Sequence, residues 1–121
     1  MTKKENSKQY DLEERTLKFA KRVRAFVRQL NKTTANIEDG RQLIRASGSV
    51  GANYIEANEA LSKKDFLMRI KICRKEAKES AYWLKLVDPG DDSELKHVRD
   101  GLIQEATELT SIFGSILRNS E

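Results

Sequence analysis

The stretch RASGSVGAN, residues 45–53, decides the fold, because it places two glycines, two serines and an asparagine inside a helical pattern. Apolar and small side chains recur at three- and four-residue steps on both sides of it, and a loop would reset that phase. The phase is unchanged across Gly48 and Gly51, which predicts one uninterrupted helix. Each glycine costs about 1 kcal/mol relative to alanine in a helix. We expect close approach of another helix backbone to offset that cost. The stripe consists of Leu43, Ile44, Ser47, Val50, Tyr54, Ile55, Asn58 and Leu61.

Working outward from this segment, the same periodicity predicts four helices, over residues 11–30, 36–61, 63–87 and 93–117. Asp11 with Glu14, and Ser62 with Asp65, have the spacing of capping boxes at the first and third helix starts. The sequence DPG at 88–90 ends the third helix, because proline cannot continue it. Short connections between long helices favour antiparallel neighbours. The prediction is therefore an all-α, up-down-up-down antiparallel four-helix bundle.

Composition restricts the class of protein. The chain has 121 residues, which fits one domain with a hydrophobic core, and 35% of them are charged. Its single cysteine, Cys73, excludes an internal disulfide and favours the cytoplasm. We expect no membrane association, because no apolar run approaches the ~20 residues of a membrane span. The N-terminal residues also lack the apolar region of a secretory signal.

The charge of the chain is unevenly distributed, with eight Lys/Arg against three Asp/Glu in residues 62–87 and the reverse sign in residues 88–121. Lysines at seven-residue spacing line the third helix, with Tyr82 near them. Such a row of cations is able to follow a phosphate backbone, although charged rows are also common on solvated helix faces. The predicted RNA- or DNA-binding residues are Lys71, Arg74, Lys78 and Lys85, with Arg24 and Arg28 as a second patch.

The second and third predicted helices each have a second face of apolar or small residues, in addition to the stripe that faces the bundle core. Apolar residues on the third helix lie away from its core stripe, and an exposed tryptophan among them favours a partner surface. On the second helix the corresponding face is small and polar, and Arg45 and Glu56 are too far apart to pair within that helix. We expect them to pair between subunits, with a solvated face as the alternative. The predicted homo-oligomer interface comprises Arg45, Ser49, Asn53, Glu56, Met68, Ile72, Trp83 and Leu86.

No catalytic, cofactor or metal site is predicted. His97 is the only histidine, and a surface role suits its place near a helix start. Cys73 falls on a core stripe, which favours a buried apolar role over that of a nucleophile. GSVG lacks the lysine and the preceding strand of a phosphate-binding loop. Glu56 and Glu59 are three residues apart, but no Glu-x-x-His pattern accompanies them.

Residues 42–87, and the pattern LKFAKRVRAFVRQL in the first helix, resemble a known family. The family consists of four-helix bundle proteins encoded in intervening sequences of bacterial large-subunit ribosomal RNA genes. The matching positions run from Arg45 and Ser49 through the Val-Gly-Ala-Asn run to Glu56, then from Phe66 to the pair Tyr82-Trp83. Gly48 departs from the family pattern, where bulkier residues are usual. The resemblance covers nearly the whole chain.

The resemblance implies an antiparallel bundle commonly assembled as a ring of five, with no enzymatic activity. The family also looks related to the accessory variability proteins of diversity-generating retroelements, which form such rings, bind nucleic acid and partner a reverse transcriptase. The leading hypothesis is a non-enzymatic homopentamer that binds RNA or DNA electrostatically. The alternatives are a protein-interaction scaffold without nucleic acid and, less favoured, a metal-carboxylate enzyme.

Overall fold

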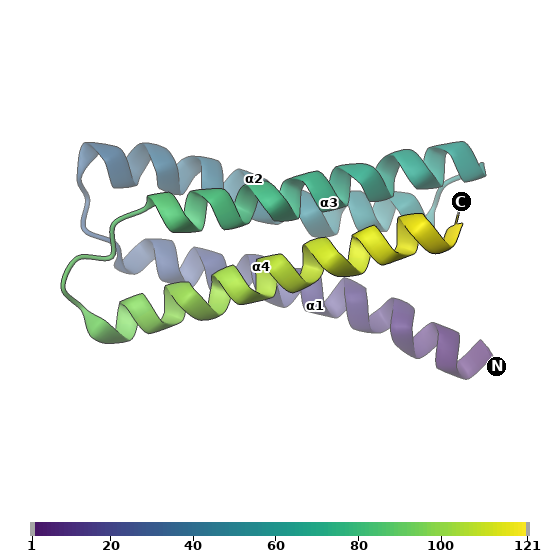
Figure 1. Cartoon of the computed structure of the whole chain (residues 1–121), viewed down its shortest axis with the longest axis horizontal. Coiled ribbons are helices and arrows are strands. Elements are labelled where there is room, and N and C mark those ends of the chain that lie inside the picture. Colours follow the sequence, from purple (N-terminus) through teal and green to yellow (C-terminus); the bar gives the residue numbers. More distant parts are fainter. Residues whose placement is uncertain (1, 121) are drawn as a thin grey trace.

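The computed structural model describes the backbone of residues 2–120 and the side chains of residues 12–120. Four helices follow one another: α1 (Thr2–Gln29), α2 (Thr34–Asn58), α3 (Lys63–Leu86) and α4 (Ser93–Ser120). They run alternately up and down, and the first turns of α1 lie apart from the other helices (Figure 1). This confirms the predicted all-α antiparallel four-helix bundle. Both α1 and α3 pack against α2 and against α4, so α1 and α3 lie diagonally opposite each other.

Helix α2 is continuous through the glycine- and serine-rich stretch, as the unbroken phase predicts. A Cβ atom added to Gly51 would lie 2.9 Å from Thr16 Oγ1 and 3.8 Å from the Thr16 carbonyl carbon. The backbones of α1 and α2 therefore approach closely at this point. Gly48 is different, because an added Cβ would meet only the guanidinium group of Arg24, at 3.2 Å.

The core lies along the bundle axis and uses side chains from all four helices. Phe19 and Phe26 of α1 are buried, and Tyr54 of α2 packs on Phe113 of α4 with ring centroids 5.8 Å apart. On α3 the buried side chains run from Ile70 to Leu84, and burial of apolar surface at about 25 cal/mol per Å² is the main force holding the helices together. The other large buried side chains are Val23, Leu43, Val50, Leu84, Leu102 and Leu109.

Helix boundaries differ from the prediction mainly at the start of α1, at the end of α2 and at the end of α4, which reaches Ser120 rather than residue 117. The backbone of α1 is already helical from Thr2, so the helix runs through Asp11 rather than starting there. Helix α2 ends at Asn58, and Leu61, predicted on its apolar stripe, is 98% exposed in the connection to α3. The physical reason is that Ser62 caps α3: its hydroxyl accepts a hydrogen bond from the Asp65 N–H, and its backbone is extended. The chain must therefore leave the helical conformation before Ser62, which ends α2 early. Ile55, also predicted on the apolar stripe of α2, is exposed.

One end of the bundle is fastened by the side chain of Asn36. Its Nδ2 donates to the carbonyl oxygens of Asn31 and Asp88, and its Oδ1 accepts from the Asp88 N–H at 2.9 Å. These bonds join the α1–α2 connection to the α3–α4 connection. In the latter, Gly90 adopts a φ of 73°, which suits glycine in the turn that the DPG sequence predicts. The relative heights of the helices, and so of their outer faces, are set here.

Candidate nucleic-acid interface

The predicted cations of α3 lie on its outer face. Lys71, Arg74, Lys78 and Lys85 are all exposed. At a rise of about 1.5 Å per residue, Lys71 and Lys85 are separated by about 21 Å along the helix axis. Among the described residues, none of the four forms an ion pair with a carboxylate. The charge of this row is therefore available to an external anion.

Tyr82 lies within this row of cations and is 58% exposed. Its ring contacts that of Trp83 edge to face, with centroids 5.1 Å apart and planes at 77°. Lys78 precedes Tyr82 by four residues and Lys85 follows it by three, and such neighbours share one face of a helix. The outer face of α3 thus combines an exposed aromatic ring with flanking ammonium groups. The sequence pattern places Tyr82 near the row but indicates no role for it.

The second predicted patch, Arg24 and Arg28, lies on α1. Arg28 is exposed, whereas Arg24 is half-buried over Gly48 and its Nη1 donates to the Ala20 carbonyl at 3.2 Å. Because α1 and α3 lie diagonally opposite, the structure does not bring this patch and the α3 row onto one surface. A single short ligand therefore cannot use both on the same subunit.

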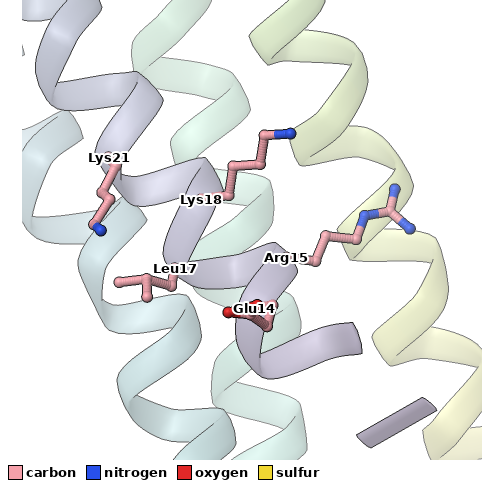
Figure 2. Close-up of a pocket in the computed structure, with 5 residues that line it drawn as sticks. All are labelled: Glu14, Arg15, Leu17, Lys18 and Lys21. Atoms are coloured by element: carbon pink, nitrogen blue, oxygen red, sulfur yellow. The ribbon is translucent and has the colours of Figure 1, made fainter. Parts of the chain in front are cut away.

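The outer face of α1 carries further cations that the sequence analysis did not select. Lys18 and Lys21 are exposed and line, with Glu14, Arg15 and Leu17, an open hollow of about 440 Å³ (Figure 2). Figure 2 shows Arg15 directed towards α4. There its guanidinium group donates to Glu105 at 2.7 Å and to Glu108 at 2.8 Å. The spacing of Lys18 and Lys21 along α1 was the signal in the sequence. Only the structure shows that Arg15 is paired, whereas Lys18 and Lys21 form no ion pair with a described residue.

The small polar face of α2 lies along its seam with α3. Arg45 Nη2 lies 3.5 Å from Glu76 Oε1 and 3.4 Å from Glu79 Oε1, in the same chain. In the same seam, Arg69 Nη1 donates to Asn53 Oδ1 at 3.0 Å.

Within the chain, Arg45 therefore has carboxylate partners on the neighbouring helix. Its pairing with Glu56 of another subunit stays a prediction. The Ser49 carbonyl oxygen accepts from Asn53 Nδ2 at 2.9 Å within α2. Glu56 is exposed.

The predicted apolar interface on α3 is partly exposed. Met68 and Leu86 are each 48% exposed, whereas Ile72 and Trp83 are half-buried. Trp83 packs against the edge of the core cluster, so it does not lie wholly outside the bundle as the sequence indicated. Whether Met68, Ile72, Trp83 and Leu86 join copies of this chain stays a prediction.

Cys73 and His97, the two residues considered for catalysis, lie far apart in character: one is buried and the other exposed. Cys73 is fully buried, and desolvation by burial raises the pKa of its thiol to about 12, which keeps it protonated and unreactive at neutral pH. His97 is exposed on α4. Among the described side chains, those of residues 12–120, no group of three His, Cys, Asp or Glu residues is placed to hold a metal ion. None of the helices described has the length and apolar character needed to cross a bilayer.

Comparison with known proteins gives two findings. The sequence profile of the 23S rRNA-intervening sequence protein family matches residues 8–113. The chain is similar to a protein of unknown function from the S23 ribosomal protein family of Bacteroides thetaiotaomicron VPI-5482, known from a crystal structure. The two share 27% sequence identity and superpose with a TM-score of 0.78 over 92% of this chain and 98% of that one. No curated protein matches the sequence.

Proposed function

This chain belongs to the family of 23S rRNA-intervening sequence proteins, and from this premise we propose that it is a non-enzymatic accessory protein that binds RNA or DNA through the phosphate backbone. In this proposal the chain assembles into a homo-oligomer, a ring of five subunits, in the bacterial cytoplasm. The ring and the nucleic-acid role follow the resemblance to ring-forming, nucleic-acid-binding accessory proteins. A reverse transcriptase is then the class of protein partner that this resemblance suggests.

The observation that carries the nucleic-acid proposal is the row of exposed cations on α3. Lys71, Arg74, Lys78 and Lys85 occupy one side of the helix, and the carboxylates Glu76 and Glu79 of the same helix face Arg45 of α2 instead. Each phosphate that a lysine or arginine neutralises releases condensed counterions, which favours binding at low salt. A row of about 21 Å is long enough to contact several consecutive phosphates.

Charge reversal tests this assignment. We expect Lys71→Glu combined with Lys78→Glu to weaken binding of a fluorescein-labelled 20-nucleotide RNA by at least about ten-fold, because two contacts become repulsive. Fluorescence anisotropy in low salt measures the affinity. The matched control is Arg41→Glu combined with Lys96→Glu, which makes the same charge change at exposed positions on α2 and α4. Equal affinities of the α3 variant and the wild type would show that the row is not the binding site.

The exposed apolar side chains of α3 support the oligomer. Met68 and Leu86 are each 48% exposed, and large exposed apolar groups favour contact with another protein surface. Light scattering coupled to size-exclusion chromatography measures the solution mass, which we expect at about five times that of one subunit. Met68→Lys combined with Leu86→Lys should lower it. A monomeric wild-type particle at micromolar concentration would contradict the ring.

A protein-interaction scaffold is the second candidate. The observation that favours it is a set of exposed aliphatic side chains outside α3, namely Leu17, Ile37 and Ile55. A partner that stays bound to the protein after nuclease treatment and in high salt would support the scaffold in place of nucleic-acid binding.

A further inference from the structure

We propose that the outer face of α3 binds unpaired, single-stranded nucleic acid, with the ring of Tyr82 stacked on a base and Lys78 and Lys85 contacting the phosphates beside it. This inference rests on the proposed function and deepens it by naming the form of the ligand. It also assigns a role to Tyr82, which the charge pattern alone leaves unexplained.

The first argument is the state of the Tyr82 ring. An aromatic side chain buries 150–250 Å² when packed in a core or interface, yet Tyr82 remains 58% exposed beside the core-packed Trp83. The edge-to-face contact with Trp83 orients the ring. In that geometry Trp83 covers at most one flat face of Tyr82, and the 58% exposure of the residue leaves ring surface accessible to a base.

The second argument is the charge around the ring. Lys78 and Lys85 are exposed and lie on the same side of α3 as Tyr82, at steps of four and three residues. Neither forms an ion pair among the described residues. Lys75 is also exposed and lies seven residues before Tyr82. An aromatic platform beside unpaired cations is the combination by which proteins bind single strands with little sequence preference.

The third argument separates single strands from duplexes. In a duplex each base is already stacked between its neighbours and only the backbone and groove edges are accessible. A protruding tyrosine therefore gains little from a duplex, whereas unpaired bases have free π-faces. The cations beside Tyr82 contact phosphates in either form, so Tyr82 should discriminate between them.

Substitution of Tyr82 tests the inference. The probes are fluorescein-labelled oligouridine and oligothymidine of 15 nucleotides, and a labelled 15-base-pair DNA duplex. We expect Tyr82→Ala to weaken binding of the single strands on the order of ten-fold and to leave binding of the duplex within about two-fold of wild type. Tyr82→Phe retains the flat ring and should bind single strands like the wild type. The two single-stranded probes distinguish RNA from DNA as the preferred ligand.

Trp83 provides an independent readout, because it is the only tryptophan of the chain and touches Tyr82. Its emission should change when a single strand binds to the wild type, and not when the duplex binds. Circular dichroism and solution mass serve as controls for both variants, since Tyr82 is exposed and neither substitution should unfold the bundle.

Three results would overturn the inference. They are unchanged single-strand binding in Tyr82→Ala, an equal loss of duplex binding, and a fall in solution mass that places Tyr82 in a subunit contact. If the wild type binds none of the three probes in about 50 mM salt, the proposed nucleic-acid function itself fails, which is a different outcome from a failure at Tyr82.

Discussion

Residues 18–28 of α1 and residues 71–85 of α3 each carry five cations on the outer side of the bundle, but the other side chains of the two segments differ. On α1 these are Lys18, Lys21, Arg22, Arg24 and Arg28, and on α3 they are Lys71, Arg74, Lys75, Lys78 and Lys85. The aromatic rings of α1 at Phe19 and Phe26 are buried in the core, whereas α3 exposes Tyr82 among its cations. Positive charge alone therefore does not distinguish the two faces, and the position of one aromatic ring does.

The two helices are also held in different ways. Helix α1 meets α2 where Gly51 lies against Thr16, without intervening side-chain bulk. Helix α3 meets α2 through apolar packing and through the polar contacts of Arg45 and Arg69. The ion pairs of Arg45 contribute at most about 1 kcal/mol, because its side chain is half exposed. The position of the α1 face therefore depends on a steric contact that one methyl group would disturb.

The largest effect expected from this comparison is the destabilisation caused by Gly51→Val. The added side chain would collide with Thr16, which is buried and whose hydroxyl is hydrogen-bonded to the Leu12 carbonyl at 2.8 Å. Overpacking of this kind lowers the free energy of unfolding by about 1–3 kcal/mol. Urea denaturation followed by circular dichroism measures the change.

The matched control is Gly48→Val on the same helix. Its side chain would meet only the guanidinium group of Arg24, which is able to move. We expect the free energy of unfolding to change by no more than about 0.5 kcal/mol, as for surface substitutions. Similar destabilisation by both variants would show that α1 is not held by the close approach at Gly51.

A smaller effect is expected from charge reversal on α1. Arg24→Glu combined with Arg28→Glu should lower the affinity for single-stranded DNA and for duplex DNA by the same factor, on the order of ten-fold or less. The reason is that this face offers phosphate contacts only. Lys78→Glu combined with Lys85→Glu, on either side of Tyr82, should also weaken binding of both probes, because these lysines contact phosphates in either form, and the preference for the single strand that Tyr82 provides should remain. Anisotropy titrations with both probes give the two ratios. A selective loss of single-strand binding in the α1 variant would reverse the roles of the two faces.

The smallest effect concerns the inner side of α3, where burial raises the pKa of the Cys73 thiol from 9.0 to about 12. The unfolded chain loses this proton at a lower pH than the folded protein does. The contribution of Cys73 to stability is therefore complete below about pH 9 and declines as the pH rises from about 9 to 12.

Urea denaturation of the wild type and of Cys73→Ala between pH 7 and 10.5 isolates this term, because Tyr54, whose pKa burial also raises, is present in both. The stability difference between them should be constant to about pH 9 and shrink above it. Reaction of the native thiol with a disulfide reagent at pH 8, at the rate of an exposed cysteine, would contradict the burial on which this prediction depends.

The sequence was sufficient for the helices and most of the core, because both depend on local periodicity. Val50 and Tyr54, on either side of Gly51, lie on one buried stripe, as the unbroken phase predicted. The sequence was insufficient wherever a contact depends on the relative position of two helices. Arg45 contacts Glu76 and Glu79 only because α2 and α3 are antiparallel with a particular register.

The same limit applies to the candidate site. The spacing of Lys71, Lys78 and Lys85 predicted a row of cations, and all three are exposed. Their separation from Arg24 and Arg28 depends on the diagonal arrangement of α1 and α3, which no local pattern contains. Exposure of Tyr82 and the half-burial of Trp83, its neighbour, likewise follow from the packing of α3 between α2 and α4.

The salt dependence of single-strand binding by the wild type tests the central claim most directly. If Lys71, Arg74, Lys78 and Lys85 contact phosphates, the logarithm of the association constant should fall linearly with the logarithm of salt concentration. Each neutralised phosphate of a single strand contributes about −0.7 to this slope, so four contacts on one subunit predict a slope of about −3. Binding whose slope is near zero between 50 and 200 mM salt, or no binding at all at 50 mM, would contradict the account.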